Sequence, residues 1–92
     1  MKAQIIVARN LRRLRVSRAL SQEALAVDAA VDRTYVSRLE RGLENPTVAV
    51  LERLSLALSA DIADFFDAAR VARGPVKPLR SGRHPRTAPL RR

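Results

Sequence analysis

The sequence contains no cysteine and no tryptophan, and it has a single histidine. The missing cysteines exclude disulfides and thiolate metal sites, and His84 alone cannot form a zinc site. We therefore expect no metal and no cofactor, and a reducing cytoplasm fits this composition. With one tyrosine and two phenylalanines, the core must be built from Leu, Val and Ala. Such a composition favours helices over sheet.

Long hydrophobic runs are also missing. No apolar stretch is long enough to span a membrane, and residues 1–15 have neither the uninterrupted apolar region nor the cleavage site of a signal peptide. The sequence likewise shows no nucleophile–base pair, metal-ligand spacing or phosphate-binding loop. We therefore expect a protein that enters no membrane and is not an enzyme.

Positive charge dominates the sequence and is unevenly distributed. Residues 70–92 contain eight basic residues and no acidic residue, whereas residues 1–69 contain the other ten basic residues and all nine acidic ones. Nine of those ten basic residues lie in residues 1–41, while residues 42–69 hold one basic and five acidic residues. A merely soluble surface would explain the total charge but not this sorting. The distribution favours a polyanion partner, and nucleic acid above all.

The composition changes near residue 70. Four of the five prolines and two of the three glycines lie in the last 19 residues, where apolar side chains are few. Such a segment cannot bury enough apolar surface to offset its ordering entropy. We predict a folded domain over residues 1–69 and a disordered Arg/Pro-rich basic tail over residues 70–92.

Helical periodicity predicts five helices within the folded domain. The first three are predicted over residues 5–18, 22–29 and 33–41, with Ser21 and Asp32 as N-caps and Gly42 ending the third helix. A fourth helix, which includes Leu58, opens after residues 45–47, which are predicted to form a turn with Thr47 as the cap. A short fifth helix is predicted to follow Asp61.

The predicted helix over residues 33–41 has two contrasting faces. At about 100° per residue, Val36 and Leu39 point toward a core, and Tyr35 flanks them. The opposite face carries two hydroxyls and two guanidiniums, those of Thr34, Ser37, Arg38 and Arg41. Arginine can bind guanine through two hydrogen bonds, and threonine offers a hydroxyl or a methyl to base edges. This face therefore suits a DNA major groove, although an ordinary solvated helix face would have a similar composition.

Four segments taken together resemble the helix-turn-helix DNA-binding family of phage-repressor type, the XRE class. They are LRRLR, LSQEALA, DRTYVSRLERG and NPTVAVLERLSLAL, within residues 11–66. Ala26 matches the small residue where the two motif helices nearly touch, and Val36 and Leu39 match two apolar positions. The resemblance implies a compact five-helix, all-α repressor-like domain that binds double-stranded DNA.

The resemblance also implies roles for individual residues. The positions that it assigns to DNA contact are Gln22, Arg33, Thr34, Ser37, Arg38 and Arg41. Gln22 would bond a phosphate at the helix N-terminus, where the helix dipole assists, and Arg41 would approach another phosphate. Glu40 matches a glutamate that pairs with an arginine of the first helix, here Arg15, which would tie that helix to the recognition helix.

Two positions depart from the family pattern. Ala30 stands where glycine is usual, because the turn there tends to take a left-handed backbone. Alanine in that conformation costs about 1–2 kcal/mol unless the turn adjusts. Ser59-Ala60 replaces a common Gly-Val pair, which makes the exit from the fourth helix harder to predict.

The three large apolar residues after Asp61 have two interpretations. Ile62, Phe65 and Phe66 could close the core of a small domain, or they could form a two-fold dimer interface. The family uses its fifth helix in this second way, so the resemblance favours a homodimer.

The leading functional hypothesis is a sequence-specific transcriptional regulator that binds an inverted-repeat operator as a dimer. Repression by occlusion is the simplest mechanism, and activation through contact with RNA polymerase is also open. The main alternative is an antitoxin that neutralises a toxin and represses its own operon. A third class is an architectural protein that binds any nucleic acid through its basic tail.

Overall fold

The computed structural model describes residues 1–73, which fold into five α-helices and one 3₁₀ helix. The elements are α1 (Ala3–Ser17), α2 (Gln22–Ala29), α3 (Arg33–Glu40), α4 (Val48–Leu58), the 3₁₀ helix η1 (Ile62–Phe66) and α5 (Ala68–Ala72). These residues contain no strand, so the all-α prediction is confirmed. None of the helices in this part of the chain is both long and apolar enough to cross a membrane. Residues 74–92 of the tail predicted over residues 70–92 lie outside the described residues.

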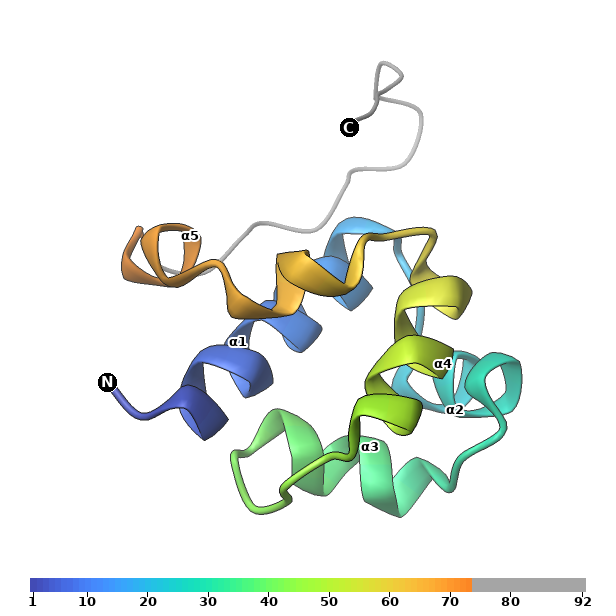
Figure 1. Ribbon diagram of the computed structural model, residues 1–92. Coiled ribbons are helices and arrows are strands. Elements are labelled where there is room, and N and C mark those ends of the chain that lie inside the picture. The colour runs from blue at the N-terminus through green and yellow to red at the C-terminus, as the bar shows by residue number, and fades with distance from the viewer. Residues whose placement is uncertain (74–92) are drawn as a thin grey trace.

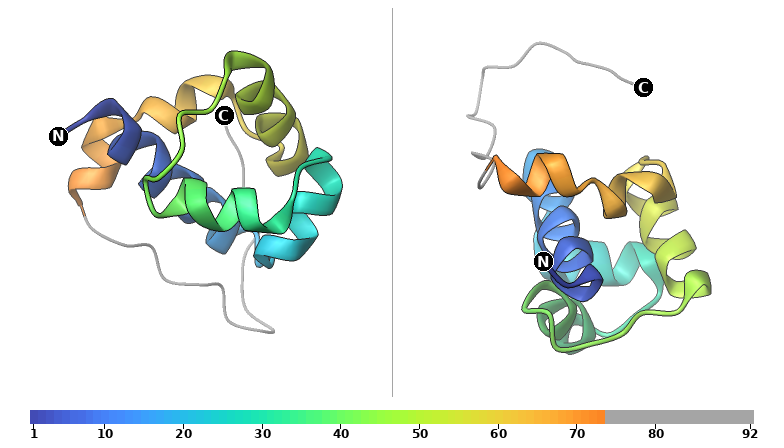
Figure 2. Two further views of the ribbon diagram at one scale, coloured as in Figure 1. Left: turned by 90° about the horizontal axis from the view of Figure 1, so that it is seen from below. Right: turned by 60° about the vertical axis from the view of Figure 1, so that its left-hand side comes forward.

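The helices enclose a single core that is aliphatic apart from Phe65. α2 packs against α3 and α4, while α1 contacts α3 on one side and η1 and α5 on another. Figure 1 shows α3 along the lower edge of the molecule, with α5 and η1 at the opposite edge. The right-hand view of Figure 2 shows the same separation. The core is formed by Val7, Leu11, Leu14, Leu25, Ala26, Ala29, Val36, Leu39, Leu51, Leu54, Leu58 and Phe65.

Two of the predicted helix caps are present. The Ser21 hydroxyl accepts a hydrogen bond from the Ala24 backbone N–H at 2.9 Å, and the Thr47 hydroxyl accepts one from the Val50 N–H at 3.1 Å. Each bond satisfies a donor that has no partner within its own helix. Asp32 occupies the predicted N-cap position of α3 with an extended backbone, but its side chain makes no capping hydrogen bond.

The segment after α4 differs from its prediction. The residues expected to form a fifth α-helix form η1 instead, and the fifth α-helix follows it. α5 spans the predicted boundary between residues 69 and 70, and Val71 on this helix is buried. The folded body therefore extends to the end of α5, because an apolar side chain beyond Arg70 still finds a buried position against α1.

A buried asparagine fastens this segment to α1. The side chain of Asn10 is fully buried, and its amide nitrogen donates to the carbonyl oxygens of Phe65 at 3.0 Å and Asp67 at 3.1 Å. Arg13, one turn further along α1, donates to the amide oxygen of Asn10. Burial of this amide is tolerated because its polar atoms are paired. The sequence offered no signal for this role, since Asn10 interrupts the apolar pattern of its helix.

The exit from α4 uses a left-handed residue without glycine. Ser59 adopts φ 52° and ψ 44°, and the following Ala60 N–H donates to the Ser55 carbonyl at 2.9 Å. The Arg18 guanidinium donates to the carbonyl oxygens of Leu58 and Ser59. The helix end where Ser59-Ala60 replaces the common Gly-Val pair is thus bound by an arginine from the end of α1.

Candidate nucleic-acid interface

The helix α3 buries one face and exposes the other. Val36 and Leu39 are 0% and 1% exposed, whereas Thr34 and Arg38 are exposed and Ser37 is half-buried. The two arginines at the ends of the helix, Arg33 and Arg41, are also exposed. α3 runs along the lower edge of the molecule in Figure 1 and crosses the view from below in Figure 2. The amphipathic pattern predicted for this helix is therefore present.

Gly42 ends α3 as predicted. It adopts φ +76°, and its N–H donates to the Leu39 carbonyl at 3.1 Å, while the next N–H, of Leu43, donates to the Arg38 carbonyl at 3.0 Å. A left-handed residue that satisfies the last helical carbonyls in this way is the usual role of a C′ glycine. A Cβ at this position would lie 2.7 Å from the terminal methyl of Ile5, which can shift, so it is the left-handed conformation that requires glycine.

The turn between α2 and α3 keeps the geometry that the family pattern implies. Ala30 adopts φ 60° and ψ 46°, a left-handed conformation, and Val31 N–H closes the turn on the Ala26 carbonyl at 3.0 Å. The turn has not adjusted to avoid the strain of an alanine. The backbone therefore stores roughly 1–2 kcal/mol at this position, while α2 and α3 remain packed through Ala26.

An ion pair between α1 and α3 braces the motif. Arg15 Nε lies 2.5 Å from Glu40 Oε2, and its Nη2 lies 3.0 Å from Glu40 Oε1. The two side chains are only 13% and 4% exposed. Arg15 also donates to the Leu20 carbonyl at 2.7 Å. The Arg15–Glu40 pair that the family resemblance implies is therefore present. Its bidentate geometry fixes the relative orientation of the two side chains as well as attracting them.

Gln22 joins this ion pair from α2. Its amide nitrogen donates to Glu40 Oε1 at 3.1 Å, and its side chain is partly buried. The two motif helices and α1 therefore meet at one carboxylate. Because one of its two amide hydrogens is directed at Glu40, only the remaining hydrogen can serve the phosphate contact predicted for Gln22.

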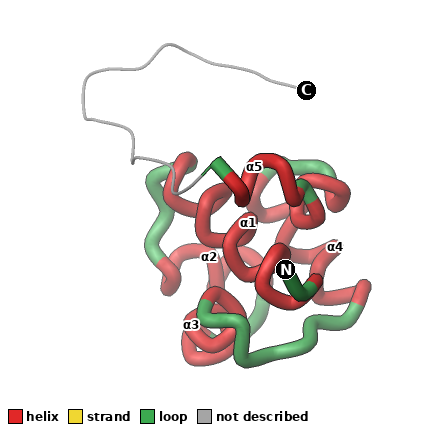
Figure 3. The backbone as a smooth tube through the Cα atoms, turned by 90° about the vertical axis from the view of Figure 1, so that its left-hand side faces the viewer, coloured by secondary structure: helices red, strands yellow, loops and turns green. Residues whose placement is uncertain are grey.

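Arg38, the central arginine of the exposed face, is held by the loop that follows α3. Its Nε donates to Glu44 Oε2 at 2.8 Å, and its Nη2 donates to the Leu43 carbonyl at 3.4 Å. The loop is in turn tied to α1, since Gln4 Nε2 donates to the carbonyl oxygens of Gly42 at 2.9 Å and Glu44 at 3.1 Å. Figure 3 shows this loop passing below the N-terminal end of α1.

Sequence reasoning did not identify Glu44 and Gln4. The only available signal was the short distance along the chain from Arg38 to Glu44, and nothing in the pattern pointed to Gln4. Glu44 also affects Tyr35. Burial raises the pKa of the Tyr35 hydroxyl, and the nearby Glu44 carboxylate raises it further. Tyr35 is therefore neutral at physiological pH and half-buried between the core and the exposed face.

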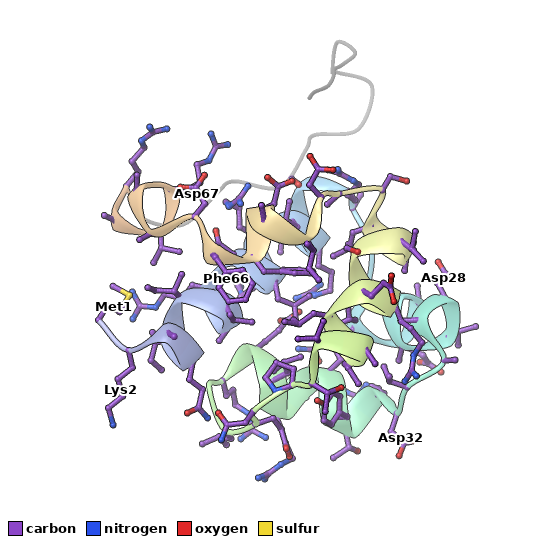
Figure 4. All side chains as sticks on the ribbon, in the orientation of Figure 1. Met1, Lys2, Asp28, Asp32, Phe66 and Asp67 are labelled. Carbon is purple, nitrogen blue, oxygen red and sulfur yellow. The ribbon has the colours of Figure 1, made fainter. Side chains whose placement is uncertain are left out.

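The three candidate dimer residues separate in the structure. Phe65 is fully buried in the core, whereas Ile62 and Phe66 are 39% and 51% exposed. The prediction that Phe65 belongs to a dimer surface is therefore wrong, because successive residues of η1 point in different directions. Phe66 lies well away from Asp32 at the start of α3 (Figure 4). A protein bound at Ile62 and Phe66 would leave α3 free.

Comparisons with known proteins identify the family. The model of the helix-turn-helix domain family matches residues 6–73. The control protein C.BamHI of Bacillus amyloliquefaciens is 34% identical over 65 residues, which cover 70% of this chain and 80% of that protein. The regulator SlrR of Bacillus subtilis is 34% identical over 64 residues, 68% of this chain but only 42% of SlrR.

A solved structure agrees with the match in sequence. The restriction-modification controller protein C.AhdI of Aeromonas hydrophila superposes with a TM-score of 0.67 at 35% identity, covering 68% of this chain and 96% of that one. The matched region includes both motif helices and the core around them. The chain therefore belongs to the helix-turn-helix family of phage-repressor (XRE) type, a family of DNA-binding transcriptional regulators.

Proposed function

We propose that this protein is a sequence-specific transcriptional regulator that reads the DNA major groove with α3. The observation that carries the proposal is the exposed face of that helix. Thr34 and Arg38 lie on it, flanked by Arg33 and Arg41 at the two ends. The helix is about the width that the major groove admits, and arginine and threonine are side chains that bind base edges.

Rigid support for α3 strengthens this proposal. The helix is anchored to the core by Val36 and Leu39 and to α1 by the Arg15–Glu40 pair. A reading helix needs such support, because a side chain that must reach one particular base tolerates little movement of its backbone. Gln22, at the start of α2, and Arg41 are proposed to contact phosphates and thereby set the position of the helix in the groove.

We further propose that the protein binds an inverted-repeat operator as a homodimer. The exposed Ile62 and Phe66, together with the exposed Leu56 at 74%, support this part of the proposal. In such a dimer each copy of α3 would read one half-site, and the half-sites would lie about one helical turn apart. Occupation of the operator would repress transcription by excluding RNA polymerase.

The same apolar residues support a second candidate function. An antitoxin uses a surface away from its DNA-binding face to bind a toxin, and the exposed apolar residues on η1 are separated from α3 in this way. The two functions share the DNA-binding step. A toxin-sized reading frame beside the gene would favour the antitoxin.

Selection of bound duplexes from a random-sequence pool, at about physiological salt, tests the proposal. Wild type is compared with the variant that carries both Thr34→Ala and Arg38→Ala. The matched control is Arg12→Ala, which removes one charge from an exposed position on α1. We expect an enriched palindrome for wild type and control, and loss of information at some of its positions for the double variant. Loss of an arginine–guanine contact should remove about 1–3 kcal/mol of discrimination.

A different result would contradict the proposal. If wild type binds every duplex equally and the double variant does the same, the protein does not read sequence with α3. Binding would then have to come from charge alone.

A further inference from the structure

The hydrogen bond between Arg38 and Glu44 suggests that Glu44 does more than stabilise the fold. Both side chains are partly exposed, at 44% and 31% for Arg38 and Glu44. An exposed pair of this kind contributes little to folding, because water and salt screen it. A carboxylate on the DNA-facing side of a positively charged protein should also weaken binding to phosphates. Its position next to the central arginine of α3 therefore needs an explanation in terms of selectivity.

The hydrogen bonds of Arg38 leave a particular edge of the guanidinium free. This group has five N–H donors. Nε–H is taken by Glu44, and one hydrogen of Nη2 is directed at the Leu43 carbonyl. Within residues 1–73, no hydrogen bond involves Nη1. Its two hydrogens and the second hydrogen of Nη2 therefore remain, and together they form the end-on fork that matches guanine O6 and N7.

The loop that carries Glu44 is itself fixed. Gln4 donates to the carbonyl oxygens on both sides of Leu43, those of Gly42 and Glu44. Gly42 holds the left-handed conformation that starts the loop. A carboxylate on a fixed backbone can direct a long side chain, whereas one on a mobile loop would follow it.

We infer that Glu44 is a positioning residue that sets the base specificity of this protein by orienting Arg38 before DNA arrives. A free arginine side chain loses rotamer freedom when it docks on a base. Because Glu44 holds Arg38, most of this rotamer freedom is already lost before the protein binds DNA. The contact also occupies the side-on edge of the guanidinium, formed by Nε and Nη2. Arg38 would therefore bind phosphates and other bases more weakly than guanine. The inference rests on the proposed function, because it requires α3 to read DNA.

The test is a double-mutant cycle on the operator selected for wild type. Affinity is measured for that duplex and for duplexes with each base pair changed in turn, using wild type, Glu44→Gln, Arg38→Ala and the double variant. We expect Glu44→Gln to lower discrimination about 3- to 10-fold, a part of the effect of losing the arginine contact itself. The loss should be confined to the base pair that Arg38→Ala affects. Binding to unrelated duplexes should be equal or tighter.

Two controls separate positioning from charge and from folding. Glu52→Gln removes the same charge from an exposed position on α4 and should leave discrimination unchanged. In the Arg38→Ala background, Glu44→Gln should cause no further loss. Thermal melting of Glu44→Gln should match wild type, because the pair is exposed.

Three outcomes would overturn the inference. If Glu44→Gln binds the operator more tightly and discriminates better, Glu44 is a competitor of the base. If discrimination is unchanged, the pair is only a surface contact. If the loss spreads over all base pairs, Glu44 acts on the loop and not through Arg38. In contrast, failure of wild type to select any duplex would refute the proposed function itself.

Discussion

At the scale of single residues, the most consequential contact is the Arg15–Glu40 pair, since three helices depend on one carboxylate. Glu40 is 4% exposed, so its charge is balanced by Arg15, with a further hydrogen bond from Gln22, and water contributes little. A buried pair of this kind need not be more stable than an apolar pair, but loss of one partner is costly. Its value lies in the orientation it gives α3.

Removal of Arg15 alone should therefore destabilise the fold strongly. We expect Arg15→Ala to lower the free energy of unfolding by about 3–5 kcal/mol, because Glu40 keeps a buried charge without its partner. Urea unfolding monitored by circular dichroism measures this. The double variant Arg15→Met with Glu40→Leu should lose clearly less. If the double variant loses as much as the single one, the cost is due to packing.

Ala30 offers the opposite case, a residue whose replacement should stabilise. Glycine tolerates φ 60° without the contact between Cβ and the carbonyl that strains alanine. We expect Ala30→Gly to raise the free energy of unfolding by about 1 kcal/mol, seen as a higher Tm. The control Ala24→Gly, inside α2, should lower it by about the same amount. If Ala30→Gly lowers the free energy of unfolding as Ala24→Gly does, the turn is not strained.

At the scale of elements, the C-terminal segment is held by polar contacts as much as by its apolar side chains. η1 and α5 have five residues each and are too short to be stable alone. Phe65 and Val71 enter the interior, and Asn10 bonds to the backbone between them. The position of Ile62 and Phe66, and with them the proposed dimer surface, thus depends on α1.

Asn10 should therefore matter more than its polar character suggests. Asn10→Ala leaves the carbonyls of Phe65 and Asp67 without their donor, and we expect a loss of about 2–3 kcal/mol of unfolding free energy. Denaturant titration checks this. Asn45→Ala, at an exposed loop position, is the control and should change stability by less than about 0.5 kcal/mol. Similar values for the two variants would show that water replaces the amide of Asn10.

At the scale of the whole molecule, the two proposed functional surfaces lie on different sides. The DNA-reading face proposed for α3 lies at one edge, and η1 and α5 lie at the other (Figure 1). A dimer through η1 would therefore leave both copies of α3 exposed, as an inverted repeat requires.

The dimer proposal predicts that one charge on η1 will separate the subunits. Phe66→Asp should raise the dimer dissociation constant at least about tenfold, since it places a carboxylate in an apolar contact. Fold should be kept, because half of the Phe66 side chain is exposed. Analytical ultracentrifugation measures the change. Val27→Asp, at an apolar position on α2 that is 74% exposed, should remain dimeric, and a wild type that sediments as a monomer at all concentrations would end the proposal.

The basic residues after Arg73 predict a strong salt dependence. A chain that ends at Arg73 keeps all of α5 and loses six basic residues. We expect the slope of log affinity against log salt to fall by up to about 0.9 for each lost phosphate contact, with sequence preference retained. The 92-residue chain with those six basic residues changed to glutamine should show the same reduced slope and keep its sequence preference. Loss of preference in either variant would assign sequence reading to this segment.

The features that could be predicted from the sequence are those that lie within one helix or at its ends. The spacing of Val36 and Leu39 indicated which face of α3 is buried, and Ser21, Thr47 and Gly42 marked helix ends. Each of these features depends on neighbours within a few residues, so the chain carries the information locally. The family motif added the Arg15–Glu40 pair.

The remaining features are contacts between segments that are far apart in the chain, and these are seen only in the tertiary structure. It placed Phe65 inside and Phe66 outside, bound Asn10 to a backbone more than fifty residues away, and joined Gln4 to the loop that holds Arg38. No periodicity predicts such contacts, because they arise only when helices from distant parts of the chain pack together. The inferred positioning role of Glu44 belongs to this second kind of information.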